Sequence, residues 1–231
     1  MRRSNATPVQ TEVPRGLMKS RTSSMRREYE RAVFDEDTAS TDPFEQFRLW
    51  FDEAAASPTI EPNAMVVATV SADGQPSQRT VLLKSWDGTG FVFYTNYESR
   101  KGRDLEQNRQ VSLLFWWADH ERQIRVEGRA ERTSPGESDA YWQQRPRGSQ
   151  IGALASPQSQ VVRNREWLAH RFAQIEAEHA GGEPVCRPHH WGGIRVVPTM
   201  FEFWQGRPNR LHDRLCYRLQ RGIWVVERLA P

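Results

Sequence analysis

Short β-rich runs separated by glycine-containing turns constrain the fold of this chain more than any other feature. Between residues 64 and 96, the runs AMVVATV, SQRTVLLK and FVFYTN are separated by turns at 72–75 and 87–90. Such turns join antiparallel strands, so we expect an antiparallel meander here. Further strands are predicted at QVSLLFWW, RQIRVEGRAER, IRVV, MFEFWQ, RLCYRL and IWVVERL. This pattern favours a mainly antiparallel β-barrel of the α+β class.

Helical spacing marks the segments that we expect around this barrel. Asp42, Pro43 and Glu45 supply an N-cap, a proline at the first helical position and a capping-box partner, and apolar residues then repeat at helical intervals to Ala54. Further helices are predicted at 99–108, 135–145 and 164–179, and MRREYERAVFDE from Met25 is helix-compatible. Residues 148–160 are rich in Gly, Ser and Gln, and predict a loop.

Composition separates the first 24 residues from the rest of the chain. They are rich in Ser, Thr, Arg and Pro, with almost no apolar periodicity, so we expect residues 1–24 to be a flexible arm. The remaining residues, 25–231, are enough for one sizeable core and predict a single domain.

Charge and cysteine content argue against several classes of function. The net charge is +3, but 29 acidic residues are interleaved with 32 basic ones, which disfavours nucleic-acid binding. Cys186 and Cys216 do not make a disulfide framework, and His179, Cys186, His189 and His190 lack the second thiolate pair of a zinc site, so we expect no metal. No apolar run reaches membrane-spanning length and no secretory h-region opens the chain. We therefore expect a cytoplasmic protein that does not bind a membrane.

Nucleotide and hydrolase motifs do not occur in the sequence. There is no Walker A motif, no GxGxxG after a strand and no GxSxG. The absence of these motifs argues against ATP-driven, Rossmann-type and α/β-hydrolase chemistry.

Two clusters of basic residues lie in the first half of the chain. Strand alternation places Arg79 and Lys84 on opposite faces unless a bulge intervenes, and both also fit simple rim charges. Tyr94-Thr95 end a strand, and Ser99-Arg100-Lys101 follow at the start of a helix, where free N–H groups favour an anion. The second cluster resembles a phosphate clamp, and a solvated helix start is the alternative.

Two more clusters lie in the second half. Tyr141 and Arg145, four residues apart, precede Arg147 and Ser149, and these side chains suit a phosphate monoester or an ordinary basic helix end. Arg210, His212 and Arg214 share strand parity and so predict one shared cavity. His212 alone also fits a structural histidine.

The strings RTVLLK, FYTNYESRKG, VSLLFWW, ERQIRVEG, RPRGSQIGA, SPQS, FEFWQG and RLHDR occur in this order. Together they resemble the pyridoxamine 5'-phosphate oxidase family, from about Met25 to the terminal ERLAP. The resemblance implies an FMN-binding split β-barrel with peripheral helices and a C-terminal dimerisation region, forming a homodimer with FMN at the subunit interface. It implies FMN contacts at Arg79, Thr80, Val81, Leu82, Leu83, Lys84, Tyr94, Thr95, Arg100, Lys101, Gln123, Gln158, Ser159, Trp204 and Arg214.

For the substrate, the resemblance implies contacts at Lys84, Tyr141, Arg145 and Ser149 around a phosphate, and Arg210 and His212 beside the ring as the catalytic pair. The segment Arg26, Arg27, Glu28 and Tyr29 resembles a family stretch that folds over the substrate. The implied reaction is oxidation of pyridoxine or pyridoxamine 5'-phosphate to pyridoxal 5'-phosphate, with O2 reduced to H2O2 and ammonia released from the amine.

Two alternatives remain open at this point. Another flavin or deazaflavin reductase on the same barrel would share the phosphate clamp but lack the Tyr141, Arg145 and Ser149 cluster and RLHDR. A basic nucleic-acid-binding module would need a recognition motif or a basic stripe, and neither is found.

Overall fold

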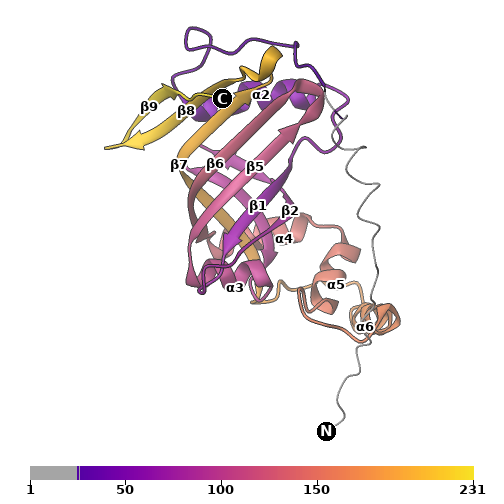
Figure 1. Cartoon of the computed structure of the whole chain (residues 1–231). Helices are drawn as coiled ribbons and strands as arrows, with labels where there is room; N and C mark the ends of the chain where they lie inside the picture. Colours follow the sequence, from indigo (N-terminus) through magenta and orange to yellow (C-terminus); the bar gives the residue numbers. More distant parts are fainter. Residues whose placement is uncertain (1–24, 26) are drawn as a thin grey trace.

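A curved antiparallel sheet forms the centre of the computed structural model, which describes residue 25 and residues 27–231. In this part of the chain, seven strands lie in the order β2-β1-β5-β6-β7-β4-β3, and β8 and β9 extend the sheet from β7 (Figure 1). The strands are β1 (Ala64–Val70), β2 (Pro76–Leu82), β3 (Ser85–Asp87), β4 (Gly90–Asn96), β5 (Gln110–Trp117), β6 (Arg122–Arg132), β7 (Trp191–Gln205), β8 (Asp213–Gln220) and β9 (Ile223–Arg228). The predicted mainly antiparallel α+β barrel is therefore confirmed.

The predicted meander is wrong, although its strands are present. β1 pairs with β2 on one side and with β5 on the other, whereas β4 pairs with β7, about 100 positions further along the sequence. The chain leaves β2 and crosses to the opposite edge, where the Lys84 backbone N–H donates to the carbonyl of Val92 at 2.9 Å. Turn residues predict where strands end, but this crossing depends on distant partners.

One long strand replaces the two that IRVV and MFEFWQ predict. β7 continues through Pro198, which lies opposite Gly128 where the β6–β7 register shifts. A Cβ atom at Gly128 would lie only 2.1 Å from the carbonyl oxygen of Val197, so the close approach of the two backbones requires glycine here.

Five α-helices and two 3-10 turns surround the sheet in the described part of the chain. They are α2 (Pro43–Ala55), α3 (Arg100–Gln107), α4 (Pro135–Gln144), α5 (Arg147–Ala155), α6 (Arg165–Glu178), η1 (Ala118–His120) and η2 (Pro208–Arg210). Asp42 caps α2 as predicted, accepting from the Phe44 N–H at 2.9 Å, but Glu45 pairs with Arg48 rather than completing a capping box. None of the described helices has the length and apolar content needed to cross a membrane.

The predicted loop at 148–160 is wrong over its first half, which is α5. Ile151 and Ala155 are four residues apart, and both are almost completely buried. Ile151 packs in a small core with Trp142 and Trp191. Tertiary burial of this face outweighs the low helix propensity of Gly and Ser.

The helix-compatible segment that starts at Met25 is not a helix in its described residues. The Glu121 carboxylate accepts the backbone N–H groups of Glu30 and Arg31 at 3.0 and 3.1 Å, and Asp213 accepts that of Phe34 at 3.1 Å. These donors bind side chains of distant segments, so they do not form the hydrogen bonds of a helix. The predicted flexible arm at 1–24 lies outside the described residues.

Aromatic side chains form the main core and attach α2 to the barrel. Phe47 and Trp50 of α2 are buried, and the Phe47 ring lies 4.8 Å from Phe91 and 5.2 Å from Phe115. The Trp50 ring lies 5.4 Å from Phe203. These contacts make the interior of the barrel rigid. The polar clusters lie at the ends of its strands.

Candidate active site

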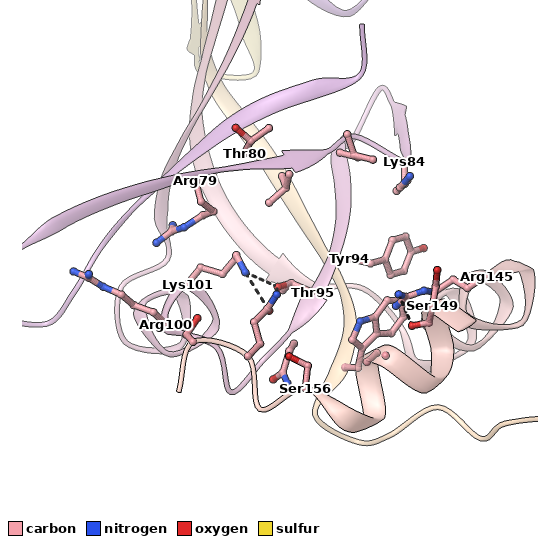
Figure 2. Close-up of a pocket in the computed structure, with 18 of the residues that line it drawn as sticks. Arg79, Thr80, Lys84, Tyr94, Thr95, Arg100, Lys101, Arg145, Ser149 and Ser156 are labelled. Carbon is pink, nitrogen blue, oxygen red and sulfur yellow. Dashed lines mark hydrogen bonds between the residues drawn. The ribbon is translucent and has the colours of Figure 1, made fainter. Parts of the chain in front are cut away.

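One cavity of about 1040 Å³ collects most of the predicted site residues. Its walls come from β2, β4, α3, the end of α4, α5 and the segment 156–159. The lining includes six cationic side chains and, among the described residues, no carboxylate: Arg79, Lys84, Arg100, Lys101, Arg103 and Arg145. Figure 2 shows Arg79, Arg100 and Lys101 at one end, and Lys84, Arg145 and Ser149 at the other. A cavity of this charge selects anions at both ends.

Lys101 is the most buried cation of the first end. Its side chain is only 7% exposed, and Nζ donates to Thr95 Oγ1 at 3.0 Å and Gln158 Oε1 at 3.3 Å. Burial, and then the Arg79 charge, lowers the pKa of the Lys101 ammonium to about 8. A buried ammonium whose neighbours are neutral oxygens is well suited to binding an anion.

A glycine brings this ammonium group to the end of β4. A Cβ atom at Gly102 would lie 2.0 Å from the carbonyl oxygen of Tyr97, so only glycine allows α3 to pack this closely on the turn. Ser99 caps the helix by accepting from the Gly102 N–H at 3.3 Å. The predicted helix-start cluster is therefore present, with Arg100 and Lys101 both lining the cavity.

Stacked aromatic rings form the wall between the two ends. The Tyr94 ring lies 3.9 Å from Tyr141 and 5.5 Å from Trp191, nearly parallel to both. The Arg145 guanidinium lies 4.5 Å from the Trp191 ring centroid and donates to the carbonyl of Ser149 at 2.9 Å. Sequence reasoning missed Trp191, because nothing local distinguishes it from the other tryptophans of the core.

The third cluster differs in detail from its prediction. α4 ends at Gln144, and Arg145 is an extended C-cap residue rather than a helical neighbour of Tyr141. Arg147 turns away from the cavity and donates to the carbonyl of Glu183 at 3.1 Å. Tyr141, Arg145 and Ser149 nevertheless line the same cavity.

Strand parity also fails for the first cluster. Arg79 and Lys84 both line the cavity, because β2 ends at Leu82 and the following residues turn toward β4. Leu83 is 3% exposed and packs in the main core, so its side chain does not line the cavity. Of the other residues for which FMN contacts are predicted, this cavity is lined by Thr80, Val81, Leu82, Tyr94, Thr95, Gln158 and Ser159.

Five other predicted site residues do not reach this cavity. This group, named here the β7-end group, comprises Gln123, Trp204, Arg210, His212 and Arg214. The strand register pairs Gln123 with Trp204 and Trp204 with Arg214, so these three form one row across β6, β7 and β8. Arg210 and His212 precede β8, and Arg210 has φ of 63°, so the predicted shared strand parity is wrong for them.

The length of β7 separates this group from the cavity. Tyr94 pairs with Gly193, and Trp204 lies eleven positions further along the same strand. At roughly 3.3 Å per residue this is about 35 Å along the strand. Figure 1 shows the same separation, with α3 and α4 at one end of the barrel and β8 and β9 at the other.

Hydrogen bonding fixes the tautomer of His212. The backbone N–H of Arg207 donates to His212 Nδ1 at 3.1 Å, so the neutral ring carries its proton on Nε2. Burial, and then the Arg210 charge, lowers the pKa of His212. At neutral pH, His212 is therefore a neutral hydrogen-bond donor through Nε2 rather than an acceptor.

The segment before the barrel covers the β7-end group. The Tyr29 ring lies 5.7 Å from Trp204 and 5.8 Å from His212, and Arg27 lies 3.5 Å from the Glu121 carboxylate. Glu28 is exposed, and Arg26 lies outside the described residues.

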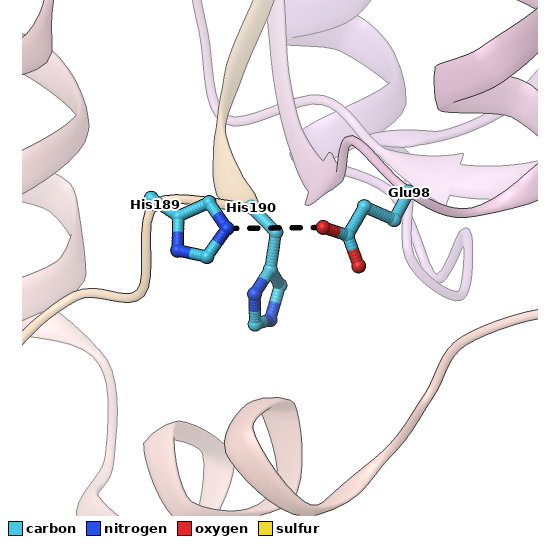
Figure 3. A group of neighbouring side chains, drawn as sticks. All are labelled: Glu98, His189 and His190. Carbon is cyan, nitrogen blue, oxygen red and sulfur yellow. Dashed lines mark ion pairs between the residues drawn. The ribbon is translucent and has the colours of Figure 1, made fainter.

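Two histidines and a carboxylate elsewhere on the protein have the composition of a metal site. They are not the same set of residues as the possible zinc site considered from the sequence. Within the described residues, Glu98, His189 and His190 bring their ligand atoms within 4.8 Å of one another (Figure 3). Neither Cys186 nor His179 belongs to this group, and His179 Nδ1 lies 2.8 Å from the carbonyl of Ile175. Because the side chains of His189 and Glu98 are 90% and 60% exposed, their 3.8 Å contact is that of a solvated surface pair.

Comparisons with known proteins show the family of this chain. The model of the family described as pyridoxamine 5'-phosphate oxidase matches residues 51–179, and that of the pyridoxine 5'-phosphate oxidase C-terminal dimerisation region matches 191–231. The pyridoxine/pyridoxamine 5'-phosphate oxidase of Bordetella petrii is 57% identical over 90% of this chain and 99% of its own length. The relative of the same description from Thermosynechococcus vestitus is 55% identical over 92% of this chain and all of its own.

Solved structures give the same fold. PhzG from Burkholderia lata, crystallised with tetrahydrophenazine-1-carboxylic acid, is 32% identical with a TM-score of 0.81, over 87% of this chain and 98% of its own. A pyridoxamine 5'-phosphate oxidase-related FMN-binding protein from Nostoc punctiforme has a TM-score of 0.68 at 17% identity, over 83% of this chain and all of its own. The chain described here belongs to the pyridoxamine 5'-phosphate oxidase family of oxidoreductases.

Proposed function

We propose that this chain binds FMN and oxidises pyridoxine or pyridoxamine 5'-phosphate to pyridoxal 5'-phosphate, passing the electrons to O2. The products are then H2O2 and, from the amine, ammonia, with one water consumed to supply the aldehyde oxygen. One observation carries the proposal: a single cavity has a cationic group at each end, and the reaction needs two phosphate sites. The relatives described by this activity support the choice of substrate.

The cofactor phosphate fits the end that contains Arg79, Arg100 and Lys101. These cations, with Thr95 and Ser159, provide the mixed guanidinium, ammonium and hydroxyl donors that a phosphate monoester needs. The β2 segment from Thr80 to Leu82, together with Lys84, Tyr94 and Gln158, extends the proposed FMN contacts. The chemistry that bound FMN supplies is acceptance of a hydride from C4' of the substrate, followed by transfer of the electrons to O2.

The substrate phosphate fits the other end. Lys84, Arg145, Tyr141 and Ser149 line it. Because Arg145 is held between Trp191 and the carbonyl of Ser149, its guanidinium is already oriented before an anion arrives.

A homodimer completes the site in this proposal. The β7-end group lies too far along β7 to reach the cavity of its own chain, so the partner of a two-fold dimer would supply Gln123, Trp204, Arg210, His212 and Arg214. The match of residues 191–231 to a dimerisation region supports this arrangement. Residues 25–231 would act as one domain, since β7 pairs with both β4 and β6.

The mechanism assigns separate tasks to these side chains. With the cofactor bound, Arg214 would place positive charge near the flavin ring, where it would stabilise the reduced form. His212 donates through Nε2, and Arg210 adds a cation beside it, so the pair orients the substrate ring instead of removing a proton. Tyr29, packed on Trp204 and His212, excludes water from this face.

The proposal is tested by a flavin spectrum and a peroxide assay on the same preparation. The purified protein should be yellow or take up FMN, and should release H2O2 with either phosphorylated substrate. A colourless chain that does not take up FMN would exclude a flavin enzyme, and FMN-loaded protein without peroxide release would favour a reductase instead.

We expect Arg145→Ala to raise KM for pyridoxine 5'-phosphate about 30-fold, because a charge-assisted hydrogen bond contributes roughly 2 kcal/mol. FMN affinity, measured by fluorescence titration, should stay within about twofold. Arg147→Ala is the matched control, since its side chain points away from the cavity. Loss of FMN from the Arg145 variant would show that the two phosphate ends are assigned wrongly.

For Arg210→Ala we expect turnover to fall about tenfold or more while flavin stays bound. Removing this positive charge should also raise the pKa of His212 toward its ordinary value, since the Arg210 charge lowers it. The pH dependence of kcat/KM measures this rise as a shift of the acid limb to higher pH. Unaltered peroxide production would remove Arg210 from the site.

A further inference from the structure

Glu202 is a buried carboxylate that has no role in the site as described so far. It lies on β7 with its side chain 3% exposed, between Arg214 of β8 and Arg125 of β6. Burying a carboxylate is costly unless its partners are well placed, and an apolar residue of the same volume often stabilises a fold better. A buried ion pair at such a position therefore calls for a role besides stability.

The carboxylate holds Arg214 by two contacts on one oxygen. Nε and Nη2 of Arg214 both lie 2.8 Å from Glu202 Oε1, and Nη1 donates to the carbonyl of Ala230 at 2.7 Å. All three guanidinium nitrogens are therefore engaged, which fixes the plane of the group.

The contact with Arg125 is of a different kind. Arg125 Nη2 lies 2.8 Å from Glu202 Oε2, yet that oxygen and Arg125 Nε, both buried, have no hydrogen-bond partner with proper geometry among the described residues. Arg125 thus balances charge without a directed bond. The directional bonds of Glu202 go to Arg214.

The strand register explains why Glu202 can reach this guanidinium. Arg125 and Glu202 are paired in a second row, on the same face of the sheet as the row that contains Gln123, Trp204 and Arg214. The two rows are two residues apart along each strand, so their side chains lie on the same face of the sheet. Glu202 and Arg214 are diagonal neighbours, a separation that long side chains can span.

We propose that Glu202 is a positioning residue, which holds Arg214 in the orientation that presents its charge to the flavin of the partner's cavity. This inference rests on the proposed function. An arginine otherwise samples many rotamers, and the carboxylate removes that freedom before the cofactor binds. Glu202 does not touch the cofactor or the substrate, and acts only through Arg214.

The test uses FMN affinity and the midpoint potential of bound FMN in the full-length protein. Glu202→Gln keeps the side-chain shape but weakens the grip on Arg214. We expect FMN to bind about tenfold more weakly. We also expect reduced FMN to lose about tenfold more affinity than oxidised FMN, a fall of about 30 mV for a two-electron couple.

The sign of the potential shift separates positioning from simple charge tuning. If Arg214 stayed in place, removing the negative Glu202 would strengthen the local positive field and raise the potential. A raised potential would therefore overturn the proposal. In an Arg214→Ala background, Glu202→Gln should change the affinity for oxidised FMN and for reduced FMN by no more than about twofold each. Its effect requires Arg214.

Glu127→Gln is the matched control. Glu127 is a half-exposed carboxylate that also pairs with Arg125, at 3.5 Å, but it does not contact Arg214. It should leave both readouts unchanged, and equal behaviour of the Glu202 and Glu127 variants would overturn the proposal.

Folding of each variant is checked by thermal unfolding of the FMN-free protein. If Glu202→Gln does not fold, Glu202→Asp carries the same test, since it keeps the charge but withdraws the oxygens from Arg214, with the same expected direction. Wild-type protein that does not bind FMN would overturn the proposed function together with this inference. FMN-binding wild type with a silent Glu202 variant overturns the inference alone.

Discussion

Replacing Lys101 by methionine should weaken FMN binding roughly a hundredfold while making the FMN-free protein more stable. The loss of affinity follows because the buried ammonium group would provide about 3 kcal/mol of charge-assisted hydrogen bonding to a phosphate. The gain in stability follows because Lys101, 7% exposed, has only neutral oxygens as hydrogen-bond partners. Burying that charge costs about 1 to 2 kcal/mol, which methionine avoids. Fluorescence titration and thermal unfolding measure the two effects.

The pH dependence of stability should identify the same group. The pKa of Lys101 is lowered to about 8 in the folded protein, from 10.5 for the free side chain. Between these values the unfolded chain binds more protons, so the stability of the FMN-free protein should rise as pH increases from 8 to 10.5. The methionine variant should lack this rise.

Arg129→Met removes one charge from an exposed position outside the cavity and serves as the control. It should leave FMN affinity and the pH profile unchanged. Lys101→Met that binds FMN as tightly as the wild type would remove the phosphate from this end of the cavity.

The sequence predicted most of the local elements of this fold, although it missed α5, and it did not predict which strands pair. The α2 helix follows from Asp42, Pro43 and the spacing of its phenylalanines, all of which act within one or two turns of chain. The crossing from β2 to β4 depends instead on β7, about 100 positions away. Turn signals fix where a strand ends, but they do not choose which strand lies beside it.

The same division applies to the site. The cluster of cations at the start of α3 was predictable, because Ser99, Arg100 and Lys101 are adjacent in sequence. That Lys84 shares a cavity with Arg79 was not, since strand alternation predicts opposite faces and the turn after Leu82 decides otherwise. Trp191 gave no signal because its stacking partners, Tyr94 and Tyr141, come from distant elements.

Mixed dimers should recover activity that two defective chains lack separately. In the proposed dimer, Lys101→Met damages the cavity of its own chain, and Arg214→Ala damages the residues that a chain lends to its partner. A mixed dimer of the two then has one doubly damaged site and one intact site. We expect about half of the wild-type turnover per mixed dimer, as two-fold symmetry requires, and less than a tenth from either homodimer. Co-expression with two different affinity tags and tandem purification isolates the mixed dimer for the peroxide assay.

A second pair of chains makes this test specific for the shared site. Lys101→Met combined with Arg145→Ala places both defects in cavities, so each site of that mixed dimer keeps one of them and activity should stay low. Equal recovery in both mixtures would mean that recovery does not depend on which group is damaged. No recovery with the Arg214 variant would mean that the β7-end group does not serve the partner's cavity. Because about 35 Å of β7 separates this group from the cavity of its own chain, that outcome would remove Arg210, His212 and Arg214 from the site altogether.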